Sequence, residues 1–422
     1  MQVLPGRVDA ALTIRKNPGR ALMNPQILVI NSGSSSLKFS LLDPESANVS
    51  ATGIAERLST KEATLKLNDL SGEKQEEDIP GADHRIALLH AIKILSKNAS
   101  LEISAIGHRV VHGGEYFKSA ALVTDEVIQR IEELTSLAPL HNPAAIQGLK
   151  VVSELFPGKP QVVVFDTAFH QTLPPYAFHY AIPNRYYQQF RVRRYGFHGT
   201  SHHYVGQQAA ARLGRPFDQL QLISAHLGNG CSATAIRFGK SVDTTMGLTP
   251  LEGVAMGTRS GDVDPNLHLF LHNTAKLSLQ EITDQLNRES GLLGVSGISH
   301  DMRTVAAAAE QGNSMAALAI ELFCYRAARA MLGLAAGLTA IDAVIFTGGI
   351  GENNSDARAR IVDHLAVLGP QLDPVRNAHH GRNSNGKITH DEGLQCLVIP
   401  TNEELMIAKE TRRITEEIIR NQ

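Results

Sequence analysis

The stretch ILVINSGSSSLKFSLL, residues 27–42, constrains the fold of this chain more than any other feature. Four apolar residues lead into a turn of Gly and Ser, after which apolar and polar residues alternate from Leu37 to Leu41. A period of two is typical of a strand, so the turn should join the two strands of a β-hairpin. Small residues let backbone N–H groups approach an anion, yet the stretch lacks the G-x-x-x-x-G-K-[ST] pattern of a P-loop. The sequence therefore predicts a phosphate-binding turn inside a hairpin.

A second stretch repeats this order of elements. LISAHLGNGCSATAIRFGKSVDTT, residues 222–245, reads as a strand, a Gly/Asn turn and two further strands. Identity between the two stretches is negligible, so the comparison rests on element order alone. One such unit in each domain would place two phosphate-sized loops on facing sides of a cleft. We therefore predict an α/β protein with the duplicated, actin-like (ribonuclease H-like) two-domain fold and an active site in the interdomain cleft.

A third Gly-rich stretch, AVIFTGGIGENNSDARARI, reads as a buried strand, a flexible turn and a helix with an acidic first turn. Its glycines, Gly348, Gly349 and Gly351, would let a flat ring or a ribose lie close to the backbone. A single glycine cluster is a weak signal, since glycines after a strand often form only a turn. Three such loops in one chain are stronger evidence for nucleotide binding.

A length of 422 residues favours two domains. We expect an N-terminal domain over residues 24–170 and a C-terminal nucleotide-binding domain over residues 171–403. The C-terminal helix, residues 404–422, should pack back on the first domain. Residues 1–23 contain scattered Arg and Lys without a sustained apolar core, which predicts a disordered leader or an upstream start codon and not a signal peptide.

The composition excludes several classes of protein. The chain has 40 basic and 42 acidic residues, so its formal charge of −2 gives no general electrostatic case for nucleic acid or an anionic membrane as a partner. No apolar run reaches the length of a membrane span. Cys231, Cys324 and Cys396 lie far apart in sequence, which argues against a disulfide framework or a structural zinc site. These features fit a protein of the reducing cytoplasm.

Polar residues follow several apolar strands, which is where the active-site residues of α/β proteins collect. Arg109 stands in GHRVVHGGE, His141 in APLHNP, Asp166 after VVVF, His198 in YGFHGTSHH and Arg259 in MGTRSGDVDP. Each has a structural alternative, since a strand-end Asp often caps a helix and an Arg beside a strand often forms a surface ion pair. Together with the three loops they suit phosphoryl transfer, in which catalysis is mostly positioning and charge neutralisation.

Two expected helix caps bear on metal binding. The histidines of YGFHGTSHH lack the Glu of an H-E-x-x-H zinc motif, and capping by Ser201 accounts for that stretch. Thr401 and Glu404 have the spacing of a capping box, which would give Glu404 a structural role. Glu403 is then the freer carboxylate for a Mg²⁺ ion.

From about Gln26 to its end, the chain resembles the acetate kinase (acetokinase) family. The resemblance rests on stretches that occur in order through almost the whole chain and are jointly highly specific. Two parts of the chain depart from the family's pattern, the N-terminal leader and the run HHGRNSNGKITH, and neither contains a matching motif. The matching stretches are INSGSSSLKFSLL, GHRVVHGGE, APLHNP, FDTAFH, YGFHGTSH, HLGNGCS, VDTTMGLTPLEGVAMGTRSGDVDP, TGGIGEN and PTNEEL.

The resemblance implies a role for each residue at a matching position. Asn31 and Glu403 would hold Mg²⁺ or Mn²⁺. The catalytic set would be Arg109, His141, Asp166, His198 and Arg259, and the acetate pocket would comprise Arg109, Val111, Leu140, Phe197 and Pro250. ATP or ADP would contact Ser34, Ser36, Lys38, His226, Leu227, Gly228, Asn229, Gly230, Asp301, Met302, Arg303, Gly349, Ile350, Gly351, Glu352 and Asn353. Val111 lies two residues after Arg109, so on a strand both side chains would face the same way.

The activity implied by the resemblance is reversible transfer of the γ-phosphoryl group of ATP to acetate, giving acetyl phosphate and ADP, by a cytoplasmic homodimer. Acetate is ionised at neutral pH and needs no general base, so we expect Asp166 to position Mg²⁺ and the arginines instead of moving a proton. Two alternatives stay open: a propionate or butyrate kinase of the same fold, and a non-catalytic ATP-driven clamp of the actin or heat-shock type. A clamp should lack paired arginines and a carboxylate pocket, and this chain has candidates for both.

Overall fold

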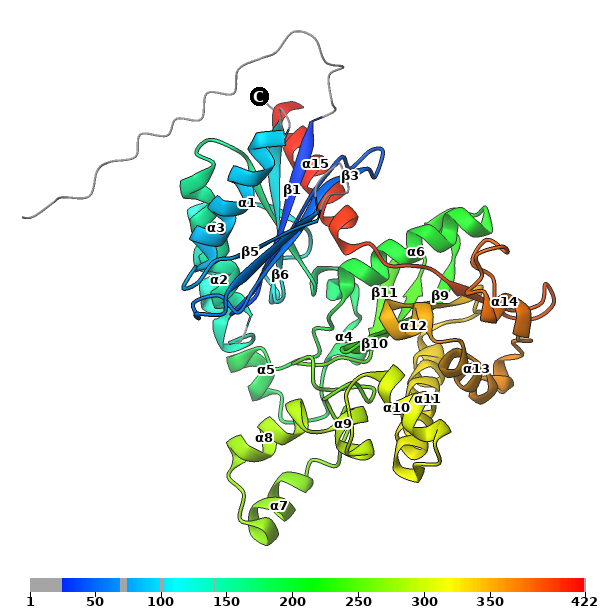
Figure 1. The fold of residues 1–422 in the computed structure, drawn as a ribbon. Coiled ribbons are helices and arrows are strands. Elements are labelled where there is room, and N and C mark those ends of the chain that lie inside the picture. The colour runs from blue at the N-terminus through cyan, green and yellow to red at the C-terminus, as the bar shows by residue number, and fades with distance from the viewer. Residues whose placement is uncertain (1–24, 69–73, 99–101, 140, 421–422) are drawn as a thin grey trace, which may run out of the picture.

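The computed structural model describes residues 25–68, 74–98, 102–139 and 141–420. The predicted leader, residues 1–23, and the predicted pocket residue Leu140 lie outside this part of the chain. Figure 1 shows two β-sheets, one in each half of the molecule, with helices packed around them. Within the described ranges, no helix combines the length and the apolar character needed to cross a lipid bilayer.

The first sheet has eight strands in the order β5-β4-β3-β2-β1-β6-β8-β7. Strands β1 to β5 are antiparallel neighbours, β6 and β8 run parallel to β1, and β7 pairs antiparallel with β8. The bounds are β1 (Gln26–Ser32), β2 (Leu37–Leu42), β3 (Val49–Glu56), β4 (Thr64–Asn68), β5 (Lys74–Asp78), β6 (Ile103–Val110), β7 (Ala121–Leu122) and β8 (Gln161–Phe165).

The second sheet repeats the centre of the first. Its order is β11-β10-β9-β12-β13, with β9, β10 and β11 antiparallel and β12 and β13 parallel to β9. This is the order β3-β2-β1-β6-β8 of the first sheet. The bounds are β9 (Gln221–Leu227), β10 (Cys231–Arg237), β11 (Lys240–Thr244), β12 (Ala343–Thr347) and β13 (Gln395–Val398). The predicted hairpins and the predicted duplication are therefore confirmed.

Helices cover both faces of the first sheet. Alternate residues of β1 point to opposite faces, so the strand contributes apolar side chains to a cluster on each face. Leu28 and Ile30 join a buried cluster with residues of α1 and α3, whereas Ile27 and Val29 join another with residues of α15. The helices of this half are α1 (His84–Asn98), α2 (Asp125–Glu133) and α3 (Asn142–Leu155). Two short helices follow, α4 (Pro175–Phe178), which contacts β11 of the second sheet, and α5 (Arg185–Phe190).

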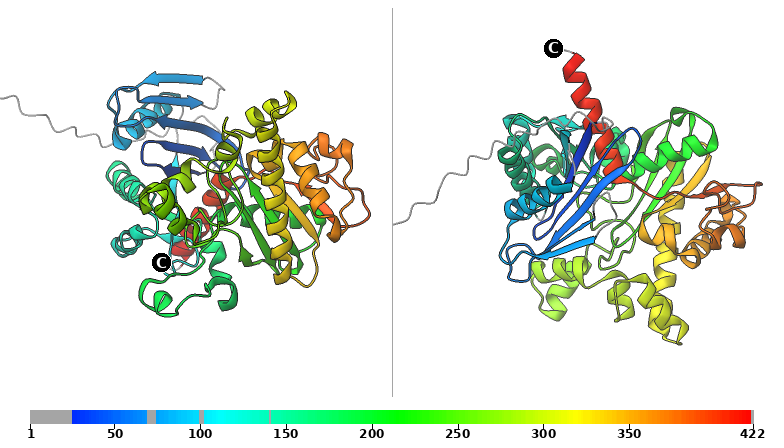
Figure 2. Two further views of the ribbon diagram at one scale, coloured as in Figure 1. Left: turned by 90° about the horizontal axis from the view of Figure 1, so that it is seen from below. Right: turned by 45° about the horizontal axis from the view of Figure 1, so that its top comes forward.

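The remaining helices belong to the second half, except α15, which returns to the first sheet (Figures 1 and 2). A Cβ on Gly107 of β6 would lie 2.4 Å from Thr411 Oγ1, so glycine permits the close approach of α15. The bounds are α6 (Gly199–Leu213), α7 (Leu267–Ala275), α8 (Leu279–Arg288), α9 (Gly291–Ser296), α10 (Met302–Glu310), α11 (Ser314–Leu334), α12 (Gly348–Asn353), α13 (Ser355–His364), α14 (Pro374–Ala378) and α15 (Glu403–Arg420).

Both predicted helix caps are wrong. Ser201 lies inside α6, where its hydroxyl contacts His226 Nδ1 and Thr401 Oγ1 at 2.8 and 2.7 Å. Asn402 takes the capping position that Thr401 was expected to occupy, since its Oδ1 accepts a hydrogen bond from Leu405 N at 2.9 Å. The side chain of Glu404 instead accepts from Ser40 Oγ on β2 at 2.6 Å. Each residue pairs with an element distant in sequence, so local spacing could not predict its partner.

Candidate active site

The carboxyl ends of the parallel strands β6 and β8 bring Arg109 and Asp166 together. Asp166 Oδ1 accepts from Arg109 Nε at 3.0 Å, and Oδ2 accepts from Nη2 at 2.7 Å. Asp166 is 2 % exposed, and its carboxylate raises the pKa of Arg109 above the ordinary value. The pair uses one edge of the guanidinium, so Nη1 and the second N–H of Nη2 stay available for another anion.

Glu403, in the first turn of α15, lies close enough to Arg109 and Asp166 to interact with both charges. Burial raises the pKa of Glu403, and the neighbouring Asp166 and Glu404 raise it further, whereas Arg109 and Lys38 lower it. Within the described ranges, its carboxylate accepts no hydrogen bond. A desolvated carboxylate without a direct partner, close to two cations, is suited to binding a ligand.

Asn31, the other predicted metal residue, stands on the same side of the sheet. It lies opposite Lys38 in the β1–β2 hairpin, and Lys38 is close enough to Glu403 to influence its pKa. The described residues contain no group of three or more His, Cys, Asp or Glu that could hold a metal ion. Mg²⁺ usually takes one or two carboxylates and completes its shell with waters and phosphates, so one carboxylate and one amide fit it.

His198 adopts an unusual backbone conformation next to the end of β8. It precedes α6 in the left-handed region, with φ of 55°. The next residue, Gly199, donates its N–H to the Asp166 carbonyl at 2.8 Å, and a Cβ there would lie only 2.3 Å from that oxygen. A glycine is therefore required at position 199, and it seats the start of α6 against the end of β8.

His198 and Arg259 converge on the turn between β9 and β10. A Cβ on Gly230 would lie 3.5 Å from both His198 Nε2 and Arg259 Nη1. Arg259 Nη1 also donates to the Pro250 carbonyl at 3.3 Å, and no described carboxylate pairs with this arginine. Burial lowers the pKa of Arg259, as expected for a desolvated cation held without a counter-charge.

His141, at the start of α3, belongs to the same group of residues. Burial lowers its pKa, and the neighbouring charges of Arg109 and Arg259 lower it further. The structure thus brings together the five predicted catalytic residues from strand ends and loops of both halves: Arg109, His141, Asp166, His198 and Arg259.

The buried histidines around this site should make the fold sensitive to acid. Burial lowers the pKa values of His108, His112, His170 and His226 to about 4, from 6.5 in the unfolded chain. Between these values the unfolded chain binds more protons, so the free energy of unfolding should fall by about 1.4 kcal/mol per pH unit for each group as the pH decreases. Urea titrations at about pH 7, 6 and 5 should give steeply decreasing midpoints. Equal midpoints would show that these groups are not buried as neutral imidazoles.

Two of the predicted nucleotide loops are neighbours. A Cβ on Gly228 would lie 3.8 Å from Gly349 N and 3.9 Å from His226 Nε2. The ring of His226 also stacks on that of His198, with centroids 4.3 Å apart. The loop after β9 and the start of α12 therefore lie beside the catalytic group, as nucleotide binding requires.

Other predicted nucleotide residues have structural partners. Glu352 Oε1 accepts from Gly348 N and Thr401 N, both at 3.0 Å, and so ties α12 to the segment before α15. Asp301 caps α10 and forms an ion pair with Arg303, whose side chain is 89 % exposed. Any contact of Glu352 or Asp301 with a nucleotide would have to compete with these bonds.

Arg358 is absent from the predicted site, although it supports the α12 loop. Its fully buried guanidinium donates to the carbonyls of Gly351, Glu352 and Asn377 at 2.8–3.0 Å. The bonds to Gly351 and Glu352 satisfy carbonyls in the last turn of α12 that have no partner within the helix, and the bond to Asn377 joins α12 to α14. Arg358 stands in a helical stretch with other arginines, so no sequence signal distinguishes it.

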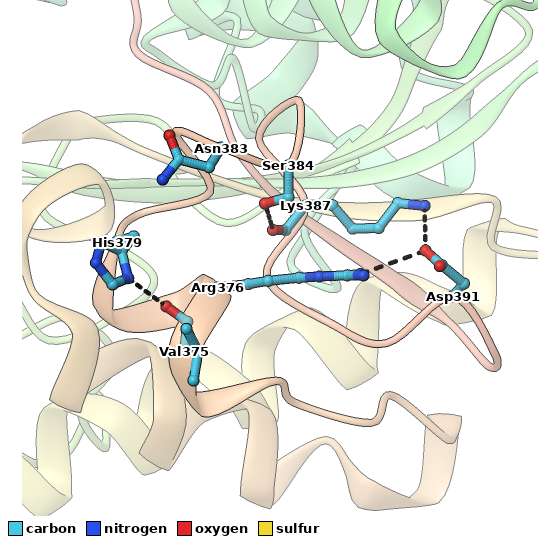
Figure 3. Close-up of a pocket in the computed structure, with 7 residues that line it drawn as sticks. All are labelled: Val375, Arg376, His379, Asn383, Ser384, Lys387 and Asp391. Carbon is cyan, nitrogen blue, oxygen red and sulfur yellow. Dashed lines mark hydrogen bonds and ion pairs between the residues drawn. The ribbon is translucent and has the colours of Figure 1, made fainter.

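A hollow of about 360 Å³ lies elsewhere in the second half, against α14 and the segment that follows it (Figure 3). This segment includes the stretch that interrupts the family resemblance. Arg376 and Lys387 both reach Asp391, at 3.3 and 2.8 Å, so their charges are already paired. The hollow contains none of the predicted site residues.

Known proteins resemble this chain over almost its whole length. Residues 26–409 match the family described as the Acetokinase family. An acetate kinase from Ectopseudomonas mendocina is 51 % identical over 385 residues, which cover 91 % of this chain and 98 % of the relative.

Solved structures show the same similarity. A propionate kinase from Francisella tularensis has a TM-score of 0.88 and 44 % identity, covering 92 % of this chain and 99 % of the other. An acetate kinase from Porphyromonas gingivalis has a TM-score of 0.87 and 41 % identity, covering 93 % of this chain and 100 % of the other.

Proposed function

The chain belongs to the acetokinase family, and from this premise we propose that it is an ATP:acetate phosphotransferase. It transfers the γ-phosphoryl group of ATP reversibly to acetate and gives acetyl phosphate and ADP. The observation that supports this best is that Arg109 and Arg259 both lie close enough to His198 to lower its pKa, and that His198 and Arg259 meet at the Gly230 turn, since an anion attacking a phosphate needs its charge neutralised. The same observation argues against a non-catalytic ATP-driven clamp.

Arg109 would bind the acetate carboxylate with the edge of its guanidinium that Asp166 leaves free. Asp166 holds the other edge through two hydrogen bonds, so the cation is already oriented before substrate arrives. Acetate is ionised at neutral pH, so Asp166 has no proton to remove from it. Its role is to position Arg109 inside a largely dehydrated site.

Arg259 and His198 would stabilise the equatorial oxygens of the transferring phosphoryl group. Both face the Gly230 turn, and both have pKa values lowered by burial, so their donors act where water cannot screen them. His141, near both arginines, would complete the set from the side of the first sheet.

ATP would lie along the turns of the two halves, with its phosphates between the β1–β2 turn at Ser34, Ser36 and Lys38 and the loop at residues 226–230. Adenosine would lie beside residues 301–303 and 349–353. Asn31 and Glu403 would hold Mg²⁺, or Mn²⁺ in its place. The ion would supply positive charge that neutralises the phosphates.

Direct assay tests the proposed activity. The protein, ATP and Mg²⁺ are incubated with acetate, propionate or butyrate, and the acyl phosphate is trapped with hydroxylamine. We expect acetyl phosphate to form, with the highest kcat/KM for acetate. Absence of any acyl phosphate would exclude the proposed activity. Faster reaction with propionate would favour the second candidate, which the similarity to a propionate kinase structure keeps open.

Val111 should set the choice between these acids. Strand β6 ends at Val110, one residue before Val111, so the two-residue spacing from Arg109 is not that of a continuous strand. Val111 nevertheless packs against the buried cluster that contains Phe197, in the other half of the molecule. Together with Pro250, which accepts from Arg259, it would border the methyl group of acetate.

Val111→Ala should therefore widen the pocket and increase the ratio of kcat/KM for propionate to that for acetate by about 10-fold, with little change in KM for ATP. The matched control is Val242→Ala, because Val242 packs against the same cluster beside Gly337 and should leave the ratio unchanged. An unaltered ratio in Val111→Ala would remove this residue from the acyl pocket.

A homodimer and a cytoplasmic location complete the proposal. Sedimentation velocity at several protein concentrations tests the dimer, which should not dissociate at assay concentrations.

A further inference from the structure

Three buried side chains form a continuous row of hydrogen bonds that ends at the half-buried His198. Ser224 Oγ lies 2.9 Å from His202 Nδ1, His202 Nε2 lies 2.8 Å from Ser232 Oγ, and Ser232 Oγ lies 2.9 Å from His198 Nδ1. Ser224, His202 and Ser232 are fully buried. They belong to β9, α6 and β10, so three elements of the second half converge on one histidine.

The direction of this row follows from counting donors. Ser224 Oγ has His202 Nδ1 as its one hydrogen-bonding partner within the described ranges. A buried hydroxyl that accepted here would leave its own hydrogen unpaired, which costs more than an unused lone pair. Ser224 therefore donates to His202 Nδ1. A neutral His202 must then carry its proton on Nε2 and donate it to Ser232.

The same count fixes the last bond. Ser232 Oγ accepts from His202 Nε2, so its single hydrogen is free to be donated to His198 Nδ1. His198 is then neutral with its proton on Nε2, the nitrogen that lies near Gly230 and Arg259. With the opposite direction, His198 would present a bare lone pair to the same point, where it would repel a phosphoryl oxygen.

We propose that Ser224, His202 and Ser232 are positioning residues that hold neutral His198 as its Nε2–H tautomer, so that Nε2 donates a hydrogen bond to the transferring phosphoryl group. This inference rests on the proposed function only where it assigns the hydrogen bond from His198 Nε2 to the transferring phosphoryl group. No proton leaves His198 during the reaction, and none of the three residues touches a substrate. Burial lowers the pKa values of His198 and His202 well below 6.5, which keeps both rings neutral.

A nearby pair provides a matched control. His170 Nδ1 lies 2.8 Å from Ser241 Oγ, and both residues are fully buried. His170 Nε2, however, lies 3.0 Å from the Phe197 carbonyl. A carbonyl can only accept, so it keeps the proton on Nε2 whether or not Ser241 is present. Ser241→Ala therefore removes a buried serine–histidine bond of the same kind without freeing a tautomer.

The first test measures the tautomer and needs no turnover. Imidazole ¹⁵N chemical shifts of the full-length protein at neutral pH are assigned by comparison with His198→Gln. We expect His198 to show a bare Nδ1 and a protonated Nε2. A proton on Nδ1, or on both nitrogens, would overturn the proposal, whether or not the protein phosphorylates acetate.

The second test is kinetic. Ser232→Ala should lower kcat by about 10- to 100-fold, the usual effect of losing a partner that orients an active-site histidine, with KM values for ATP and acetate within about threefold of wild type. Ser232→Thr, which keeps a hydroxyl, should recover most of the rate, and Ser241→Ala should keep the wild-type rate. Equal losses in Ser232→Ala and Ser241→Ala would indicate a packing defect and contradict a tautomer role. If either Ser232 variant fails to fold, the wild-type ¹⁵N measurement decides alone.

Discussion

Replacing Arg259 by alanine should lower kcat by about 100- to 1,000-fold, because it removes a cation held ready in a dehydrated site. The guanidinium has no described carboxylate partner, and its one backbone bond, to Pro250, does not neutralise it. Its charge is therefore available to the phosphoryl group, where it should act mainly in the transition state. KM for acetate should change much less than kcat, since we assign the carboxylate to Arg109.

The stability of this variant separates catalysis from folding. Burial lowers the pKa of Arg259, so the folded state gains little from its charge, and Arg259→Ala should melt at or slightly above the wild-type temperature. Arg259→Lys, which keeps a charge but loses the planar fork, should recover part of the rate. Arg130→Ala serves as a control, because Arg130 forms a surface ion pair with Glu133 on α2. Near-normal turnover in Arg259→Ala would exclude this residue from the reaction.

The sequence predicts those parts of the fold that leave a local pattern of residues, such as the two hairpins. Alternation in LKFSLL identified the first hairpin, and the repeated element order around His226 identified the second. The edge strand β5 shows the limit of such patterns, because its five residues, KQEED, are all polar. It pairs with β4 through backbone bonds and lies at the edge of the sheet, so it needs no apolar face.

The candidate site was predictable as a set of residues but not as a set of contacts. Arg109 and Asp166 each follow an apolar run, yet their ion pair joins residues 57 positions apart. The sequence predicts local caps for Ser201, Thr401 and Glu404, because spacing along the chain shows only local partners. Ser232 ends the matching stretch HLGNGCS, yet the sequence predicts no role for it, whereas the structure places its hydroxyl between two histidines. Long-range polar partners of this kind depend on how the elements pack.

Asp166→Asn should lower kcat about as much as Arg259→Ala. Unlike Arg259→Ala, it should also lower the free energy of unfolding. The amide keeps one acceptor and turns a donor toward Arg109, so the guanidinium loses its counter-charge and one of its two bonds. We expect kcat to fall by at least about 100-fold. We also expect the free energy of unfolding to fall by about 3 kcal/mol, the low end for breaking a buried pair, because Glu403 also faces Arg109.

A double variant distinguishes the loss of kcat from the loss of stability. In Arg109→Gln/Asp166→Asn both charges are absent and two amides can pair, so urea unfolding should show that much of the lost stability returns. The rate should not return, because no cation then faces the carboxylate of acetate. The single variant Arg109→Gln leaves Asp166 buried without a partner and should be the least stable of the three. Recovery of rate together with stability would mean that the pair only supports the fold, and the carboxylate site would then have to be sought at Arg259 and His141.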